Sequence, residues 1–89
     1  MDIKHLKYFV HIVDAGGFSE AARKLYVSQP NLSKAVRNLE EHLDTKLFYM
    51  EGNRAKLTEE GKNLYRLSQV AIEQYDNVFD EMLHLKQYA

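Results

Sequence analysis

The chain has 89 residues, of which 45% are apolar and 28% are charged, with a formal net charge of −1 and no cysteine. This length and balance are typical of one globular domain, and the absence of cysteine excludes disulfides and thiolate metal sites. The N-terminus lacks a signal-peptide core and the longest apolar run, Leu47 to Met50, is far too short for a membrane span, so we expect a cytoplasmic protein.

The N-terminal part of the chain predicts two helices separated by glycines. Apolar residues at spacings of three and four mark the buried face of the first helix: Ile3, Leu6, Val10 and Val13, widened by Phe9 and Ile12. Gly16 and Gly17 end this helix because glycine adopts the left-handed conformation that closes helices. Ser19 is the expected N-cap of a short second helix, with Ala21 and Ala22 facing inward.

A third helix is predicted over residues 28–43, with Ser28 as its N-cap and Pro30 in its first turn. Its apolar stripe consists of Leu32, Val36, Leu39 and Leu43. Its opposite face is polar and basic: Gln29, Asn31, Ser33, Lys34, Arg37 and Asn38. Only residues 25–27 separate the second and third helices, which predicts a helix-turn-helix. No acidic residue lies between Ala21 and Leu39, so the near-neutral chain can still present a positive face to DNA.

A short hairpin and a long helix are predicted to follow. Strand candidates at residues 46–50 and 55–57 flank a turn at residues 51–54, which gives a wing over residues 47–57. Thr58 begins a capping-box-like start in which Gly61 stands where Glu would be ideal. From Glu59 the helical sequence runs to the end of the chain, a length of roughly 45 Å.

The long helix carries an apolar seam with near-heptad spacing. We expect this seam to form a dimer interface through Leu64, Leu67, Ala71, Tyr75, Val78, Phe79, Met82 and Leu85. The three short helices cannot cover so long a stripe, so a second chain is expected to cover it. The pattern stops without a C-cap, which we interpret as the end of an N-terminal fragment of a longer protein.

Motifs along almost the whole chain resemble those of the LysR-type transcriptional regulators of bacteria. The most specific is the stretch from Ala21-Ala22 through Leu25, Val27-Ser28-Gln29-Pro30 and Leu32-Ser33. The stretches 6–9, 17–22, 39–48 and 57–61 follow in the same order and spacing. The resemblance implies a mainly α winged helix-turn-helix over residues 1–58 and a dimerising linker helix over residues 59–89.

The resemblance also implies partners. The helix over residues 28–43 would enter the major groove of double-stranded promoter DNA, and the wing would touch the backbone or the minor groove. Such regulators bind interrupted palindromes as homodimers and often form tetramers. Their small-molecule effector binds a C-terminal domain that this chain lacks, so we expect no cofactor here.

The candidate DNA-binding residues have distinct chemistry. Gln29 lies where side chains first reach base edges, and its amide can pair with adenine N6 and N7. Pro30 can touch a thymine methyl, although its structural role in the first turn is the better explanation. The remaining candidates are phosphate or base ligands: Ser19, Ser28, Asn31, Ser33, Lys34, Arg37, Arg54 and Lys56. Ser19 and Ser28 are also explained by N-capping, and the helix face by simple solvation.

The wing departs from the family pattern. Many members carry arginine at the positions of Met50 and Asn53, so we expect a weaker electrostatic contribution that depends mostly on Arg54. The four histidines, His5, His11, His42 and His84, lack ligand spacing, and no catalytic motif is present, so neither a metal site nor an enzyme is predicted. Two alternatives remain: a protein-interaction module, which the near-neutral charge favours, and a different winged-helix regulator that is complete at this length.

Overall fold

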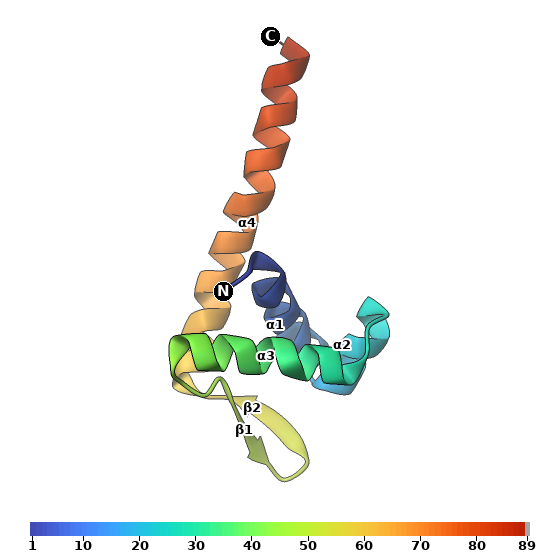
Figure 1. Ribbon diagram of the computed structural model, residues 1–89, viewed down its shortest axis with the longest axis vertical. Helices are drawn as coiled ribbons and strands as arrows, with labels where there is room; N and C mark the ends of the chain where they lie inside the picture. The colour runs from blue at the N-terminus through green and yellow to red at the C-terminus, as the bar shows by residue number, and fades with distance from the viewer. Residues whose placement is uncertain (89) are drawn as a thin grey trace.

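The computed structural model describes residues 1–88, so residue 89, the last of the predicted 59–89 segment, lies outside the described residues. Within this range the elements are α1 (Ile3–Ala15), α2 (Phe18–Leu25), α3 (Gln29–Leu43), β1 (Phe48–Glu51), β2 (Arg54–Leu57) and α4 (Glu59–Tyr88). In Figure 1, α3 crosses α1 and α2, the hairpin β1–β2 hangs below α3, and α4 projects away on the opposite side. The molecule measures 55 × 27 × 18 Å, and the projecting helix accounts for the longest of these dimensions.

The first helix begins and ends as its sequence predicts. The Asp2 carboxylate accepts the backbone N–H of Lys4 at 3.0 Å, and Gly16 closes the helix with a φ of 85°, which glycine adopts without steric cost. The centre of the buried face is shifted from the predicted stripe, because Phe9 and Ile12 are fully buried while Val10 and Val13 are only half-buried.

The predicted N-cap of the second helix is wrong. The cap is Gly17 rather than Ser19, since α2 begins at Phe18 and the Gly17 carbonyl accepts the N–H of Ala21 at 3.1 Å. Ser19 therefore lies inside the first turn, with its hydroxyl available for other contacts. The C-cap is Tyr26, whose positive φ of 56° turns the chain sharply towards α3.

The third helix confirms its predicted cap, and its predicted stripe except for Leu43, which is exposed at the C-terminal end of the helix. The Ser28 hydroxyl accepts the N–H of Asn31 at 3.2 Å, and Pro30 lies in the first turn. The buried residues of α3 are Leu32, Ala35, Val36 and Leu39. Leu32 and Val36 join a core cluster with α2 and the C-terminal half of α1, and Leu39 joins a second cluster with the N-terminal half of α1 and Leu47.

The hairpin is anchored to the core at its base. Phe48 packs edge-on against Phe9 and Phe18, with ring centroids 5.5 and 5.3 Å apart, respectively. The pairing is antiparallel with Phe48 opposite Leu57, Met50 opposite Ala55 and Glu51 opposite Arg54. The strands are shorter at the start and longer at the turn than predicted, because Lys46 and Leu47 belong to the loop that enters β1.

The start of α4 explains the unusual glycine in its capping sequence. The Thr58 hydroxyl accepts the N–H of Gly61 at 3.0 Å, as a capping residue does. A Cβ on Gly61 would lie within 3.0 Å of the Leu47 carbonyl oxygen, so the glutamate that a capping box favours has no space here.

The N-terminal half of α4 packs on α1 of the same chain. Leu64, Tyr65 and Ile72 cover the cluster around Leu6 and Phe9, and Ser68 is buried between them. No helix among the described residues has the length and hydropathy to cross a membrane.

Two polar contacts hold α4 to α1 at the edges of this packing. The Tyr65 hydroxyl donates to the Asp14 carboxylate, and this hydrogen bond, with smaller contributions from burial and from the Asp14 charge, raises the pKa of Tyr65 above 10.0. The Lys7 ammonium lies 3.4 Å from the Asp76 carboxylate and 5.2 Å from the centre of the Tyr75 ring.

Candidate nucleic-acid interface

One side of α3 presents polar and basic side chains to solvent. Gln29, Asn31, Lys34 and Arg37 are exposed, whereas Ser33 is half-buried. Neither Lys34 nor Arg37 forms an ion pair with any of residues 1–88, so both charges are available to an external anion. Because the opposite side of α3 is fixed in the core, these side chains stand on a rigid element.

Ser19 and Gln29 are joined across the helix-turn-helix. The Ser19 hydroxyl donates to the Gln29 side-chain oxygen at 3.1 Å. That oxygen has a second lone pair and the amide nitrogen keeps both of its hydrogens, so Gln29 can still accept from adenine N6 and donate to adenine N7. The bond orients the Gln29 side chain, which gives Ser19 a role other than the predicted cap.

A groove between the helix-turn-helix and the wing brings several predicted residues together. The groove residues from the predicted set are Ser19, Gln29, Ser33 and Arg54. They come from α2, α3 and β2, so residues far apart in the sequence share one surface. Met50 and Asn53, the two departures in the wing, line the same groove.

The two sides of the hairpin differ in chemistry. The strand register places Arg54 and Lys56 on one side with Tyr49 and Glu51, and Met50 and Ala55 on the other. Glu51 is directly opposite Arg54, so the charge of the wing tip is partly balanced. Lys56 lies next to Gly16 and Gly17 at the end of α1 and does not line the groove that holds Gln29.

Lys46 is a groove residue that was not among the predicted DNA-binding residues. Lys46 and Arg37 line a second groove between α3 and β1, together with Met50. The sequence does place a lysine immediately before the wing. Because Lys46 and Arg37 are separated in the chain, their proximity could not be predicted from it.

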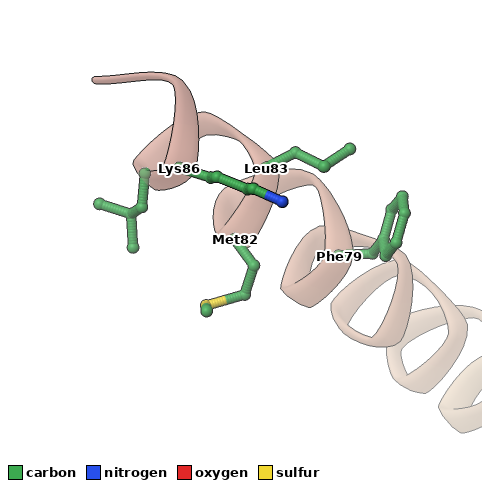
Figure 2. A pocket seen from close by; sticks show the side chains of 5 residues that line it. Phe79, Met82, Leu83 and Lys86 are labelled. Carbon is green, nitrogen blue, oxygen red and sulfur yellow. The ribbon is translucent and has the colours of Figure 1, made fainter. Parts of the chain in front are cut away.

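The exposed face of α4 contains most of the predicted dimerisation residues. Leu64 is the exception, since it is half-buried against the core of its own chain. The exposed members of the set are Leu67, Ala71, Tyr75, Val78, Phe79, Met82 and Leu85. Figure 2 shows Phe79, Met82 and Leu83 projecting from the last turns of α4, where they line a shallow apolar hollow with Leu85 and Lys86.

Groups that a metal would require are not brought together by the fold. Within residues 1–88, no three side chains of histidine, aspartate or glutamate lie close enough to share an ion. The polar groups of the candidate interface are hydroxyls, amides and cations, which suit phosphate and base edges.

Comparison with known proteins gives a consistent result. Residues 3–62 match the family of bacterial regulatory helix-turn-helix proteins of the lysR family. The chain is 40% identical over 85 residues to the transcriptional regulator BenM of Acinetobacter baylyi, covering 96% of this chain and 27% of BenM. It is 47% identical over 57 residues to the regulator YwbI of Bacillus subtilis, covering 64% of this chain and 19% of YwbI. This chain thus spans only about a fifth to a quarter of these relatives.

Solved structures agree with the fold. The crystal structure of the BenM DNA-binding domain with catB site 1 DNA superimposes with a TM-score of 0.92 at 32% identity, covering 98% of this chain and 94% of that one. The complex of the CbnR DNA-binding domain with DNA gives 0.90 at 27% identity, covering 96% and 98%. The predicted winged helix-turn-helix with a long C-terminal helix is confirmed. The matching family and relatives are transcriptional regulators, which agrees with the prediction that the chain is not an enzyme.

Proposed function

Because the chain belongs to the LysR family of bacterial regulatory helix-turn-helix proteins, we propose that it binds double-stranded promoter DNA sequence-specifically and regulates transcription. The observation that carries this proposal is the polar face of α3, where Lys34 and Arg37 have no ionic partner among the described residues and Gln29 is oriented by Ser19. The DNA in the BenM and CbnR complexes supports the choice of ligand.

In the proposed complex α3 enters the major groove. Gln29 reads one base pair through its amide, and Pro30 contacts a neighbouring thymine methyl. Ser28, Asn31 and Ser33 lie in the first two turns of the recognition helix, where hydroxyls and amides reach phosphates or base edges. Lys34 and Arg37 neutralise phosphates.

The wing plays a smaller electrostatic part in this proposal. Arg54 binds a phosphate beside the groove that holds Gln29, and Lys56 binds one on the α1 side of the hairpin. Glu51, opposite Arg54, reduces the attraction of the wing tip for phosphate.

The functional unit in this proposal is a homodimer formed through α4. The exposed apolar residues of its distal half would be buried against a second copy, which places two α3 helices on an interrupted palindrome. The full-length protein would be a cytoplasmic regulator that forms a tetramer. Its small-molecule effector would bind a further domain. This chain itself would need no cofactor.

Fluorescence anisotropy on duplexes selected by the wild-type chain from a random library tests the proposal. Affinity should fall steeply with salt, because binding releases counterions from the DNA. Gln29→Ala should cost about 1–3 kcal/mol on the selected site and relax discrimination at one base pair. Arg54→Ala should weaken all sequences alike.

Two outcomes would contradict the proposal. Failure to enrich any duplex, or binding that is insensitive to salt, would exclude DNA as the ligand and favour a protein-interaction module. If Gln29→Ala left the sequence preference unchanged, Gln29 would not be a base-reading residue.

A further inference from the structure

The two grooves beside α3 share lining residues, and together we call them the α3–β1 channel. Ser33, Met50 and Ala55 line both of them, and Phe18 contributes to the floor of each. On the α3 side the channel follows residues spaced by about one helical turn: Gln29, Ser33, Arg37 and Glu40. On the wing side Met50 and Ala55 face them. The channel therefore separates the recognition helix from the hairpin along most of their length.

The geometry of duplex DNA gives this channel an occupant, if the proposed function holds. The major groove and the adjacent minor groove are separated by one sugar–phosphate strand. A protein that places α3 in the major groove and the hairpin at the neighbouring minor groove must accommodate that strand between the two elements. The α3–β1 channel lies between these two elements, and Figure 1 shows the hairpin beside α3.

The channel is lined by both cationic and apolar groups, which suits the alternating phosphates and sugars of a DNA strand. Arg37 and Lys46 line the channel, and the Lys46 side chain is 82% exposed. Val36, Phe48, Met50 and Ala55 provide apolar lining in the same groove. Phosphates would meet the cations and the apolar faces of deoxyribose would meet the lining.

Two acidic groups line this channel: Glu20, which is paired with Arg23, and Glu40, whose charge is largely satisfied. The Glu40 side chain is only 13% exposed, and one carboxylate oxygen accepts the backbone N–H of Leu47 at 2.8 Å. The other oxygen lies 3.9 Å from the Lys46 ammonium, a loose contact that an exposed lysine can exchange for a phosphate. The channel therefore retains a net positive charge, because Arg37, Lys46 and Arg54 outnumber Glu20 and Glu40.

Met50 is an unusual residue for this position. It is 66% exposed although it is apolar, and it belongs to the same side of the hairpin as the core residues Phe48 and Leu57. An apolar side chain that continues the core outwards, over a channel lined by cations, is suited to contact with deoxyribose rather than with phosphate.

We propose that the α3–β1 channel seats the DNA strand between the two grooves, with Lys46 and Arg37 on phosphates and Met50 on a deoxyribose. This inference rests on the proposed function and adds Lys46 and Met50 to the interface. The contact is independent of base sequence, and it fixes the depth and register of α3 in the major groove. The wing of this chain thus contributes by apolar contact where charge is scarce.

Two substitutions on the selected duplex separate the two kinds of contact. Lys46→Gln should reduce the salt slope by about 0.9 and the affinity roughly eightfold at 0.1 M salt, which is what one lost phosphate contact implies. Met50→Ser should reduce affinity roughly fivefold, equivalent to about 1 kcal/mol, with the salt slope unchanged. Met50→Leu should retain the affinity, because it keeps an apolar side chain there.

Lys62→Gln is the matched control for charge. Lys62 is an exposed lysine paired with a neighbouring carboxylate, Glu59, at 3.2 Å, but it does not line the channel. This variant should bind like the wild type. Hydroxyl-radical footprinting, which reads the accessibility of deoxyribose, should show a short protected run on one strand that weakens in Met50→Ser.

The outcomes distinguish this inference from the proposed function. If the wild type binds with a steep salt dependence but Lys46→Gln and Met50→Ser behave like Lys62→Gln, the channel does not hold the strand. If the wild type enriches no duplex, the proposed function and this inference both fail. Circular dichroism of each variant confirms that these substitutions of exposed residues leave the fold intact.

Discussion

Gly61 is the position where one added methyl group tests the packing of α4 against the hairpin. An alanine Cβ there would lie within 3.0 Å of the Leu47 carbonyl oxygen, 3.1 Å from the Leu47 carbonyl carbon and 2.9 Å from Leu57 Cδ2. The Leu57 methyl group can rotate away, but the Leu47 backbone cannot. The Leu47 side chain is completely buried, and its carbonyl accepts the N–H of Thr58 at 3.0 Å.

Two opposing effects set the magnitude for Gly61→Ala. In an unobstructed helix this substitution gains about 0.8–1 kcal/mol of stability. Overpacking costs about 1–3 kcal/mol, and we expect the upper half of that range because the obstacle is backbone. The net result is a loss of about 1–2 kcal/mol, which lowers the Tm by roughly 4–16 °C for a domain of this size.

Thermal unfolding followed by far-UV circular dichroism measures this change. All variants are compared at one protein concentration, because self-association adds to the apparent stability. Asn63→Ala is the control, since it places the same alanine at an exposed position of α4 and should not lower the Tm. A Tm for Gly61→Ala equal to or above that of the wild type would refute the reasoning.

Three further substitutions test other features of the structure. Stability should fall as the pH rises above about 10, because the unfolded chain releases the Tyr65 proton before the folded chain does, and Tyr65→Phe should lose this component, measured by urea unfolding against pH. Ser28→Ala should destabilise the domain by about 1 kcal/mol in urea unfolding, because the N–H of Asn31 loses its acceptor. Met82→Glu should shift light scattering towards the monomer, because it places a charge on the exposed apolar face of α4.

Each of these predictions has a contradicting result, and the predictions for Tyr65 and Met82 also have a control. Tyr26→Phe, at a fully solvated tyrosine, should keep the alkaline transition, and an unchanged transition in Tyr65→Phe would remove Asp14 as its cause. Asn63→Glu, the control for Met82→Glu, adds the same charge near the start of α4 and should leave the oligomeric state seen by light scattering unchanged. A Met82→Glu dimer as strong as that of the wild type would place the interface elsewhere, and a neutral Ser28→Ala would mean that solvent replaces the cap.

Local patterns in the sequence predicted the helices and most of their ends. The caps at Ser28 and Thr58 depend on hydrogen bonds to residues three positions away, so the sequence contains all of the relevant information. The prediction that Ser19 caps the second helix was wrong for a related reason. Serine is a good capping residue, but Gly17, two positions earlier, is the residue at which the helix begins.

Contacts between distant segments could not be predicted in this way. The Asp14–Tyr65 and Lys7–Asp76 pairs join residues 51 and 69 positions apart, and neither motif nor periodicity relates them. The seam of α4 was predicted as one interface, yet Leu64 belongs to the core of its own chain. The proximity of Lys46 and Arg37 likewise follows from the way the chain returns along α3 after residue 43.

Because α4 packs on α1, the direction in which the distal half of α4 presents its side chains is fixed relative to the DNA-binding domain. The contacts that Tyr65 and Asp76 make with α1 fix how α4 is rotated about its own axis relative to α3. One residue inserted after Asn77 would turn every later side chain by roughly 100° and advance it by about 1.5 Å. The last turns would then present Phe79 and Met82 in a new direction, while the domain below kept its structure. The rotation of this helix about its own axis, as much as its length, thus determines how two such domains would be oriented on one duplex.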